Sequence, residues 1–203
     1  MKILVVTLML AAFSFRAGAQ SQPVDCSRRT AQDYVPITRQ DREAEYIRSL
    51  VYPEAFLFAG TVAGVEQAAD WPKETGQGGR AYARRFGNAY AFNAITMSLQ
   101  DGFALGLGED NRYFASGRQG VARRLEFALV SPFLAWHGDG SRSVSISALG
   151  GVAAGSLIQL AWQPPSTANM RYVGFSFGMT FAFRMGLDVV REFGPRRVRD
   201  ILR

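Results

Sequence analysis

The sequence predicts an all-α protein, a bundle of five to six helices packed through stripes of small residues. Glycine or alanine recurs at a spacing of four on several segments, and residues so spaced share one helix face and let helices approach closely. These segments are also rich in Ala and Leu and carry helix start and stop signals. The small residues that we expect at helix contacts are Gly60, Gly64, Gly151, Gly155, Gly174, Gly178, Ala182 and Gly186.

The composition excludes several classes of site. The 203 residues carry a formal net charge of +6 and include one cysteine and one histidine. These counts exclude an internal disulfide framework, a cysteine-rich zinc site and a multi-histidine metal site. The histidine, His137, lies in an expected turn without a nucleophile at a catalytic spacing, so we expect no catalytic residue, cofactor or metal. The basic residues form no dense stripe, and nucleic acid is not an expected partner.

The N-terminus resembles a secretory signal peptide over residues 1–19. Lys2 supplies the positive charge, an apolar run follows, and Ala17-Gly18-Ala19 matches the small-residue cleavage rule. We therefore expect export, to the periplasm or to a membrane of the cell envelope; the alternative is a retained anchor helix. The mature chain would comprise a flexible arm over residues 20–36, a helical domain over residues 37–195 and a basic tail over residues 196–203.

The first half of the helical domain contains three expected helices. Thr38 and Asp41 resemble a capping box, which begins a helix over residues 38–50. Pro53 suits the first position of a second helix, whose residues 55–65 carry no charge. A third helix is expected over residues 80–107.

The second half begins with a polar loop over residues 108–120 and contains three further expected helices. The fourth covers residues 121–136, and the turn Gly138-Asp139-Gly140 separates it from an uncharged fifth helix over residues 144–162. Asn169 caps the sixth helix, which ends at Phe193. We expect Gly194 to adopt the left-handed conformation that ends many helices.

The last segment leaves an alternative open. Over residues 173–189, apolar side chains alternate with small or polar ones, which is typical of a strand and, in an exported protein, of a transmembrane β-barrel. The same residues place a small-residue stripe on one helix face. A barrel of this size would show about eight alternating stretches rather than one. The sequence therefore favours a helix, and the barrel is the alternative fold.

Two groups of charged residues are candidates for a site. The loop beside two apolar segments holds Glu109, Asp110, Arg112 and Tyr113. We expect its carboxylates to cap the next helix and to pair with Arg123 or Arg124. The alternative is a polar site for a cation or a lipid head group, in a lipid- or small-ligand-directed enzyme.

The second group lies within the apolar segments and comprises Glu66, Asp101, Arg124, Glu126, Arg184 and Asp188. Arg184 and Asp188 are four residues apart and share a helix face. Because an unpaired buried charge is costly, we expect ion pairs between helices that fix their register. The alternative is a polar binding pocket inside the bundle.

Short motifs are spread over residues 36–195. They are Pro36-Ile37-Thr38, Gly76-Gln77-Gly78-Gly79 with Tyr82 and Arg85, Glu109-Asp110-Asn111-Arg112-Tyr113-Phe114, Gly117 and Arg191-Glu192-Phe193. In these motifs the chain resembles an uncharacterised family of exported, helix-rich bacterial envelope proteins. Its members commonly carry Pro where Asn111 stands and Trp where Gly194 stands. The resemblance implies a helix-rich envelope protein and no particular activity.

These features predict a non-enzymatic exported protein of the cell envelope, a structural or binding component that associates with a membrane or lipid. A second copy of the chain or another envelope protein is a further expected partner. Two alternatives stay open: an enzyme that uses the loop over residues 109–112, and an outer-membrane β-barrel.

Overall fold

The computed structural model describes residue 31 and residues 34–195, and this part of the chain is mostly helical, in agreement with an all-α fold. The predicted signal peptide, most of the predicted arm and the basic tail lie outside the described residues. The α-helices are α2 (Arg39–Val51), α3 (Pro53–Ala68), α4 (Gly79–Leu107), α5 (Val121–Val130), α6 (Ile146–Gln159) and α7 (Met170–Phe193).

The helix starts follow the sequence signals. The Thr38 side chain accepts a hydrogen bond from the Asp41 backbone, and Pro53 stands in the first turn of α3. Asn169 caps α7 by accepting from two backbone N–H groups. These three signals are confirmed, and the segment whose alternation also fits a barrel strand is a helix.

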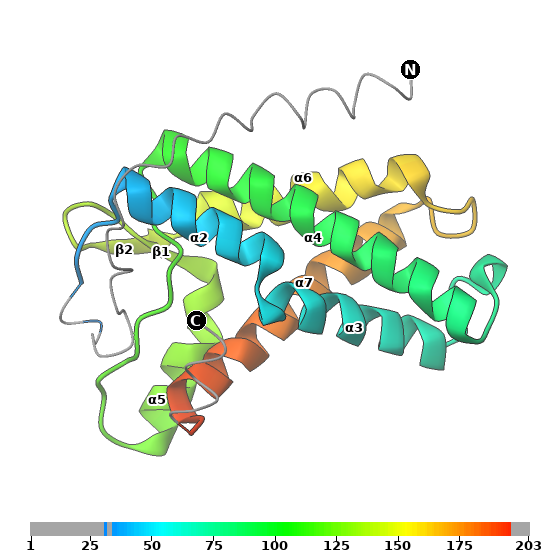
Figure 1. Ribbon diagram of the computed structural model, residues 1–203. Coiled ribbons are helices and arrows are strands. Elements are labelled where there is room, and N and C mark those ends of the chain that lie inside the picture. Colours follow the sequence, from blue (N-terminus) through cyan, green and yellow to red (C-terminus); the bar gives the residue numbers. More distant parts are fainter. Residues whose placement is uncertain (1–30, 32–33, 196–203) are drawn as a thin grey trace.

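The longest helix, α4, lies beside both α3 and α6 (Figure 1). Gly151 faces Gln100 and Gly155 faces Thr96, so α6 runs antiparallel to α4. On the side of α3, a core of Phe58, Val62 and Phe92 packs against Phe183 of α7. The C-terminal half of α7 lies next to α5 (Figure 1).

The expected fourth helix ends early. Pro132 lacks a backbone N–H and its ring clashes with the preceding turn, so α5 stops at Val130. A 3-10 turn, Ser131–Phe133, leads into β1 (Leu134–Trp136), which pairs antiparallel with β2 (Arg142–Val144). The prediction of helix up to residue 136 is therefore wrong, whereas the turn between the two strands lies where the sequence places it.

Gly194 also differs from its prediction. Its φ of −64° and ψ of 154° are extended rather than left-handed. Pro195 follows, and the proline ring disfavours helical geometry in the residue before it. The helix stops here because of the proline rather than because of glycine's conformational freedom.

The stripes of small residues have two different environments. A Cβ on Gly151 would lie 2.8 Å from the Gln100 Cα, so α4 and α6 touch there with almost no space between their backbones. In α7, Gly174, Gly178 and Gly186 are exposed, and a Cβ on any of them would meet no described atom within 4 Å. Ala182 is exposed as well. The prediction that this stripe packs against another helix of the chain is wrong.

The α3 pair also packs loosely. A Cβ on Gly60 would lie 3.6 Å from the Tyr82 hydroxyl, an ordinary contact, and one on Gly64 would meet no described atom. Close approach through glycine is thus a property of the α4–α6 contact.

Candidate functional site

A cavity of about 230 Å³ lies between α2, α3, α4, α7 and the loop that follows α4. Ten charged side chains line it: Arg42, Arg112, Arg142, Arg184, Arg191, Glu45, Glu54, Asp101, Asp110 and Asp188. Both groups of charges from the sequence contribute to this lining, since Asp110, Arg112 and Tyr113 come from the loop and Arg184 and Asp188 from α7. Glu109 and Arg124 do not line the cavity.

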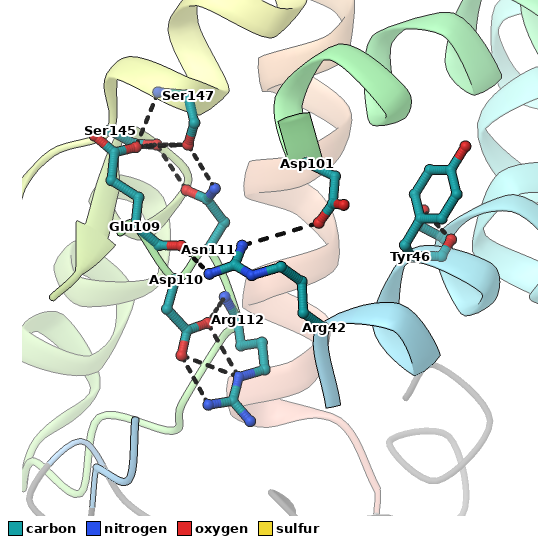
Figure 2. A network of polar contacts seen from close by, with 10 residues as sticks. Arg42, Tyr46, Asp101, Glu109, Asp110, Asn111, Arg112, Ser145 and Ser147 are labelled. Atoms are coloured by element: carbon teal, nitrogen blue, oxygen red, sulfur yellow. Dashed lines mark hydrogen bonds and ion pairs between the residues drawn. The ribbon is translucent and has the colours of Figure 1, made fainter. Parts of the chain in front are cut away.

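Asp110 and Arg112 form a tight pair at the edge of the cavity (Figure 2). The Asp110 carboxylate accepts from the Arg112 backbone N–H and guanidinium, the shortest distance being 2.7 Å to Nη2. The Asp110 backbone also pairs in both directions with Trp136 of β1. Because Asp110 is 1% exposed, the pair is a buried structural link between the loop and the hairpin.

Glu109 does not line the cavity, and its side chain lies next to Ser145 and Ser147 at the start of α6 (Figure 2). Its carboxylate accepts from the backbone N–H groups of Ile146 and Ser147 and from the hydroxyls of Ser145 and Ser147. Burial alone would raise the pKa of Glu109, but these hydrogen bonds outweigh burial and lower it. A carboxylate held ionised at a helix N-terminus stabilises the helix dipole.

Arg42 connects α2 to the same loop. Its Nη2 donates to the Glu109 carbonyl at 2.8 Å, and its Nη1 lies 3.9 Å from the Asp101 carboxylate of α4 (Figure 2). Asp101 was predicted to form an ion pair between helices, and it does so at long distance. Its partner, Arg42 of α2, was not among the residues that the sequence analysis singled out.

The opposite wall of the cavity centres on Arg191. Its guanidinium donates to Glu54 of α3 at 2.6 Å and to Asp188 at 2.9 Å. Burial raises the pKa of Asp188 to about 6, against the opposing effect of Arg191. Asp188 thus pairs with Arg191 and not, as the spacing of four had indicated, with Arg184.

Arg184 reaches into the cavity without a carboxylate at ion-pair distance among the described residues. Its Nη2 donates to the Gln100 Oε1 at 2.7 Å and contacts the Met97 sulfur at 3.9 Å. Burial lowers the pKa of Arg184 to about 10, so it remains a cation at neutral pH.

Arg142 is the second lining arginine with no described carboxylate partner at such a distance. Its guanidinium lies between the rings of Phe127 and Trp136, 4.6 and 4.8 Å from their centroids. It donates to the Ser131 hydroxyl at 3.3 Å, and its Nε is buried without a hydrogen-bond partner in the described part of the chain. Two aromatic faces replace a carboxylate as its stabilising surroundings.

Arg124 belongs to a separate cluster around Glu192. The Glu192 carboxylate, 3% exposed, accepts from the hydroxyls of Tyr113 and Ser116, both at 2.6 Å, and from Arg124 Nε at 2.8 Å. Arg124 also donates to the Glu192 carbonyl. This cluster joins the loop and α5 to the end of α7, so the expected pairing of Arg124 with the loop carboxylates is wrong.

A second polar group lies at the other end of the helices. Glu66 of α3 is 1% exposed and accepts from the Tyr172 hydroxyl at 3.0 Å, while its Oε2 has no described partner. Asn88 and Gln159 also contact the Tyr172 hydroxyl. Burial raises the pKa of Glu66 to about 7.

The geometry favours binding and structural roles over catalysis for these groups. Glu109, Asp110 and Glu192 are fully engaged by donors of their own chain, and Glu126 is exposed on α5. The His137 ring is hydrogen-bonded to the Ser143 hydroxyl across the hairpin. Within the described residues, no group of three or more His, Cys, Asp or Glu side chains could hold a metal ion.

The sequence analysis did not single out several charged or polar residues of the cavity as site residues: Arg42, Glu45, Glu54, Gln100, Arg142 and Arg191. Glu54 follows Pro53 at the start of α3, and its carboxylate binds Arg191, which lies 137 positions further along the chain. A local pattern carries no signal for such a distant pair.

Comparison with known proteins returned no family model, no curated protein and no solved structure similar to this chain.

Proposed function

We propose that this protein is a non-enzymatic, exported component of the bacterial cell envelope that associates with a membrane. The observation that carries the proposal is the distribution of polarity in the helices. Large apolar side chains cover their outer faces, while many polar and charged side chains are buried between them.

The outer apolar surface extends over several helices. Exposed large side chains include Phe56, Leu57 and Val65 of α3, Phe103, Leu105 and Leu107 of α4, Leu157 and Ile158 of α6, and Val190 and Phe193 of α7. Leu105 is 62% exposed and Leu157 is 50% exposed. Extended apolar surface of this kind marks a contact with a membrane or another protein.

Some of the contacts between helices are polar. Ser156 and Gln159 of α6 are buried, as are Ser176 and Thr180 of α7, and Gln159 accepts from the Ser176 hydroxyl at 3.0 Å. Hydrogen bonds between helices through serine, threonine and glutamine are frequent inside membranes. This arrangement supports lipid as the surroundings of the outer faces.

The uncharged stretches of α4 and α7 are shorter than the hydrocarbon core of a membrane. Among the described residues, α7 is the one helix long and apolar enough to cross a membrane by length and composition, and 22% of its apolar window is buried. The uncharged stretches over residues 86–100 and 172–183 correspond to about 22 and 18 Å of helix. Both are shorter than a hydrocarbon core of about 30 Å.

We further infer that the helices pack as one bundle of five to six helices. The support is the α4–α6 contact at Gly151 and Gly155, together with the apolar core shared by α3, α4 and α7. Small residues that face outward, as in α7, remain available for lipid or for a second copy of the chain.

Cell fractionation tests membrane association. We expect the protein in the membrane fraction after carbonate washing. The double change Leu157→Ser and Ile158→Ser should shift it toward the soluble fraction, because two exposed apolar side chains are lost without disturbing the interior. Glu43→Ser, on the exposed surface of α2, is the control and should change nothing. Release of the unaltered protein by carbonate would contradict the proposal.

Export is tested separately. N-terminal sequencing of the protein from the envelope should start at Gln20, as cleavage after the small-residue motif requires. A start at Met1 would refute cleavage and leave the membrane experiment intact.

A further inference from the structure

Arg184 is a half-buried cation in the lining of the cavity. Arg42, Arg112 and Arg191 each lie within 4 Å of at least one lining carboxylate. The Arg184 guanidinium donates to the neutral Gln100 oxygen, contacts the Met97 sulfur and lies 5.6 Å from the centroid of the Phe181 ring. Asp188 attracts this guanidinium from beyond ion-pair distance. A guanidinium that is partly removed from water and has no carboxylate at ion-pair distance is stabilised when an anion binds beside it.

Most of the carboxylates of the cavity lining are paired with arginines other than Arg184. Asp188 is the closest acid in sequence, but its carboxylate binds Arg191 at 2.9 Å, and the same guanidinium also binds Glu54. Asp101 is directed to Arg42, and Asp110 to Arg112. Arg142 adds a second cation to the lining, and Glu45 contributes a carboxylate from an exposed position on α2.

The space next to Arg184 is bounded by apolar as well as polar groups. Ala55, Phe58, Phe183 and Leu187 line the cavity together with the arginine. The cavity has a volume of about 230 Å³. This volume suits a small organic molecule.

We propose that this cavity binds a small organic anion whose carboxylate or phosphate group contacts the guanidinium of Arg184 and whose apolar body lies along Phe58, Phe183 and Leu187. A guanidinium offers parallel N–H donors that match the two oxygens of a carboxylate or of a phosphate. Nε and Nη1 of Arg184 donate to no described acceptor and are available for such a group.

This inference goes beyond the proposed function, because the cavity would bind its anion wherever the protein resides. Failure to bind an anion would leave membrane association untouched, and release from the membrane would leave anion binding untouched.

The test is isothermal titration calorimetry on the purified full chain with three probes: hexanoate, glycerol 3-phosphate and the neutral analogue hexanamide. Three proteins are compared: the unaltered chain, Arg184→Gln and Arg171→Gln. Arg171 is an exposed arginine on the same helix, so its variant removes the same charge outside the cavity. Leu187→Trp is a further variant that fills the cavity and keeps Arg184.

We expect hexanoate, glycerol 3-phosphate or both to bind the unaltered chain and Arg171→Gln equally. Arg184→Gln should bind roughly tenfold to a hundredfold more weakly, the effect of one charge-assisted hydrogen-bonded contact. Binding of hexanoate alone assigns a carboxylate, and binding of glycerol 3-phosphate alone assigns a phosphate ester. Hexanamide should not bind measurably.

Three results would overturn the proposal: no binding of either anion up to about 10 mM, equal affinities in Arg184→Gln and the unaltered chain, or binding of hexanamide as tight as that of hexanoate. If Arg184→Gln does not fold, Leu187→Trp decides the question, because it should lose binding through steric exclusion. Unchanged affinity in Leu187→Trp would place the ligand outside the cavity and refute the proposal.

Discussion

The two helices α6 and α7 carry small residues at the same spacing, but α6 buries its small-residue face whereas α7 exposes it. In α6, the glycine face packs on α4, so closely that a Cβ on Gly151 would lie 2.8 Å from the Gln100 Cα. In α7, the face with Gly178 is open, and the buried face carries Tyr172, Ser176, Thr180, Asp188 and Glu192. Spacing alone therefore identifies a face of a helix but not what that face contacts.

The difference follows from helix geometry. Residues two positions apart lie about 200° apart around an α-helix, so the glycine stripe and the stripe that begins at Tyr172 occupy opposite faces of α7. Only one of them can face the interior. The buried stripe holds polar groups that have partners there, whereas α6 carries no charge and loses little by burying backbone.

The largest expected effect comes from a matched pair of bulky substitutions. Gly155→Leu should lower the free energy of unfolding by about 3 kcal/mol or more, because a Cβ there would lie 3.3 Å from the Thr96 Cα and the rest of the side chain would force α4 and α6 apart. Gly178→Leu should change it by less than about 1 kcal/mol. Thermal unfolding in one detergent measures both, and equal losses would refute the contrast between the two faces.

A smaller effect is expected in the pH dependence of stability, and it tests the polar face of α7 that points into the protein. Burial raises the pKa of Glu66, which contacts Tyr172, to about 7 from its ordinary value of 4.5. The folded state therefore binds the proton more tightly, and the stabilisation is complete below about pH 4.5 and is lost as pH rises to about 7. The unaltered chain should lose about 1–3 kcal/mol of its free energy of unfolding over this interval, and Glu66→Gln should not show this loss.

The measurement is the unfolding temperature between pH 4 and pH 8 for the unaltered chain, Glu66→Gln and Glu126→Gln. Glu126 is exposed on α5 and serves as the control. The same slope in Glu66→Gln as in the unaltered chain would show that this carboxylate is not held in a buried, neutral form.

The cap of α6 should respond to pH in the opposite direction. Burial opposes ionisation of Glu109, but the donors from Ser145, Ile146 and Ser147 lower its pKa, so its stabilisation is present above the ordinary pKa and is lost as pH falls. Glu109→Gln should cost about 1–2 kcal/mol at neutral pH, because an amide leaves some of these donors unsatisfied.

The consequence of Glu109→Gln should be confined to α6. Hydrogen exchange should increase in the first turn of α6 and leave the first turn of α7, which Asn169 caps, unchanged. Faster exchange in both turns would indicate a general loss of structure rather than a lost cap.

Local chemistry allowed the helix starts to be predicted, whereas the partners of the buried charges could not be. Thr38, Pro53 and Asn169 act within one turn of chain, so their residue type is sufficient evidence. Arg191 and Glu54 meet only because α3 and α7 lie side by side, and no spacing along the chain encodes that contact.

For the candidate site, the sequence identified some of the residues but not their partners. The sequence identified Arg184 and Asp188 as charges within an apolar segment, and both line the cavity. The sequence analysis paired Arg184 with Asp188 because they are four residues apart. In the structure Asp188 instead pairs with Arg191, which is three residues away on the same helix and directs its side chain toward Asp188. That Arg184 has no carboxylate within ion-pair distance among the described residues depends on how the neighbouring helices are arranged, which the sequence alone does not encode.

The smallest expected effect is the most discriminating, because the same change, glycine to alanine, should alter the free energy of unfolding in opposite directions at two positions. Alanine is favoured over glycine in a helix by about 0.5–1 kcal/mol, since glycine loses more conformational freedom on folding. At Gly178 the added Cβ meets no described atom within 4 Å, so Gly178→Ala should raise the free energy of unfolding by this amount. At Gly151 the same Cβ would lie 2.8 Å from the Gln100 backbone, and Gly151→Ala should lower it despite the better helix propensity. Denaturant titrations of the two variants measure the signs directly. Destabilisation by Gly178→Ala would mean that this face is covered in the native protein, and the stripe on α7 would then be an interface with another copy of the chain.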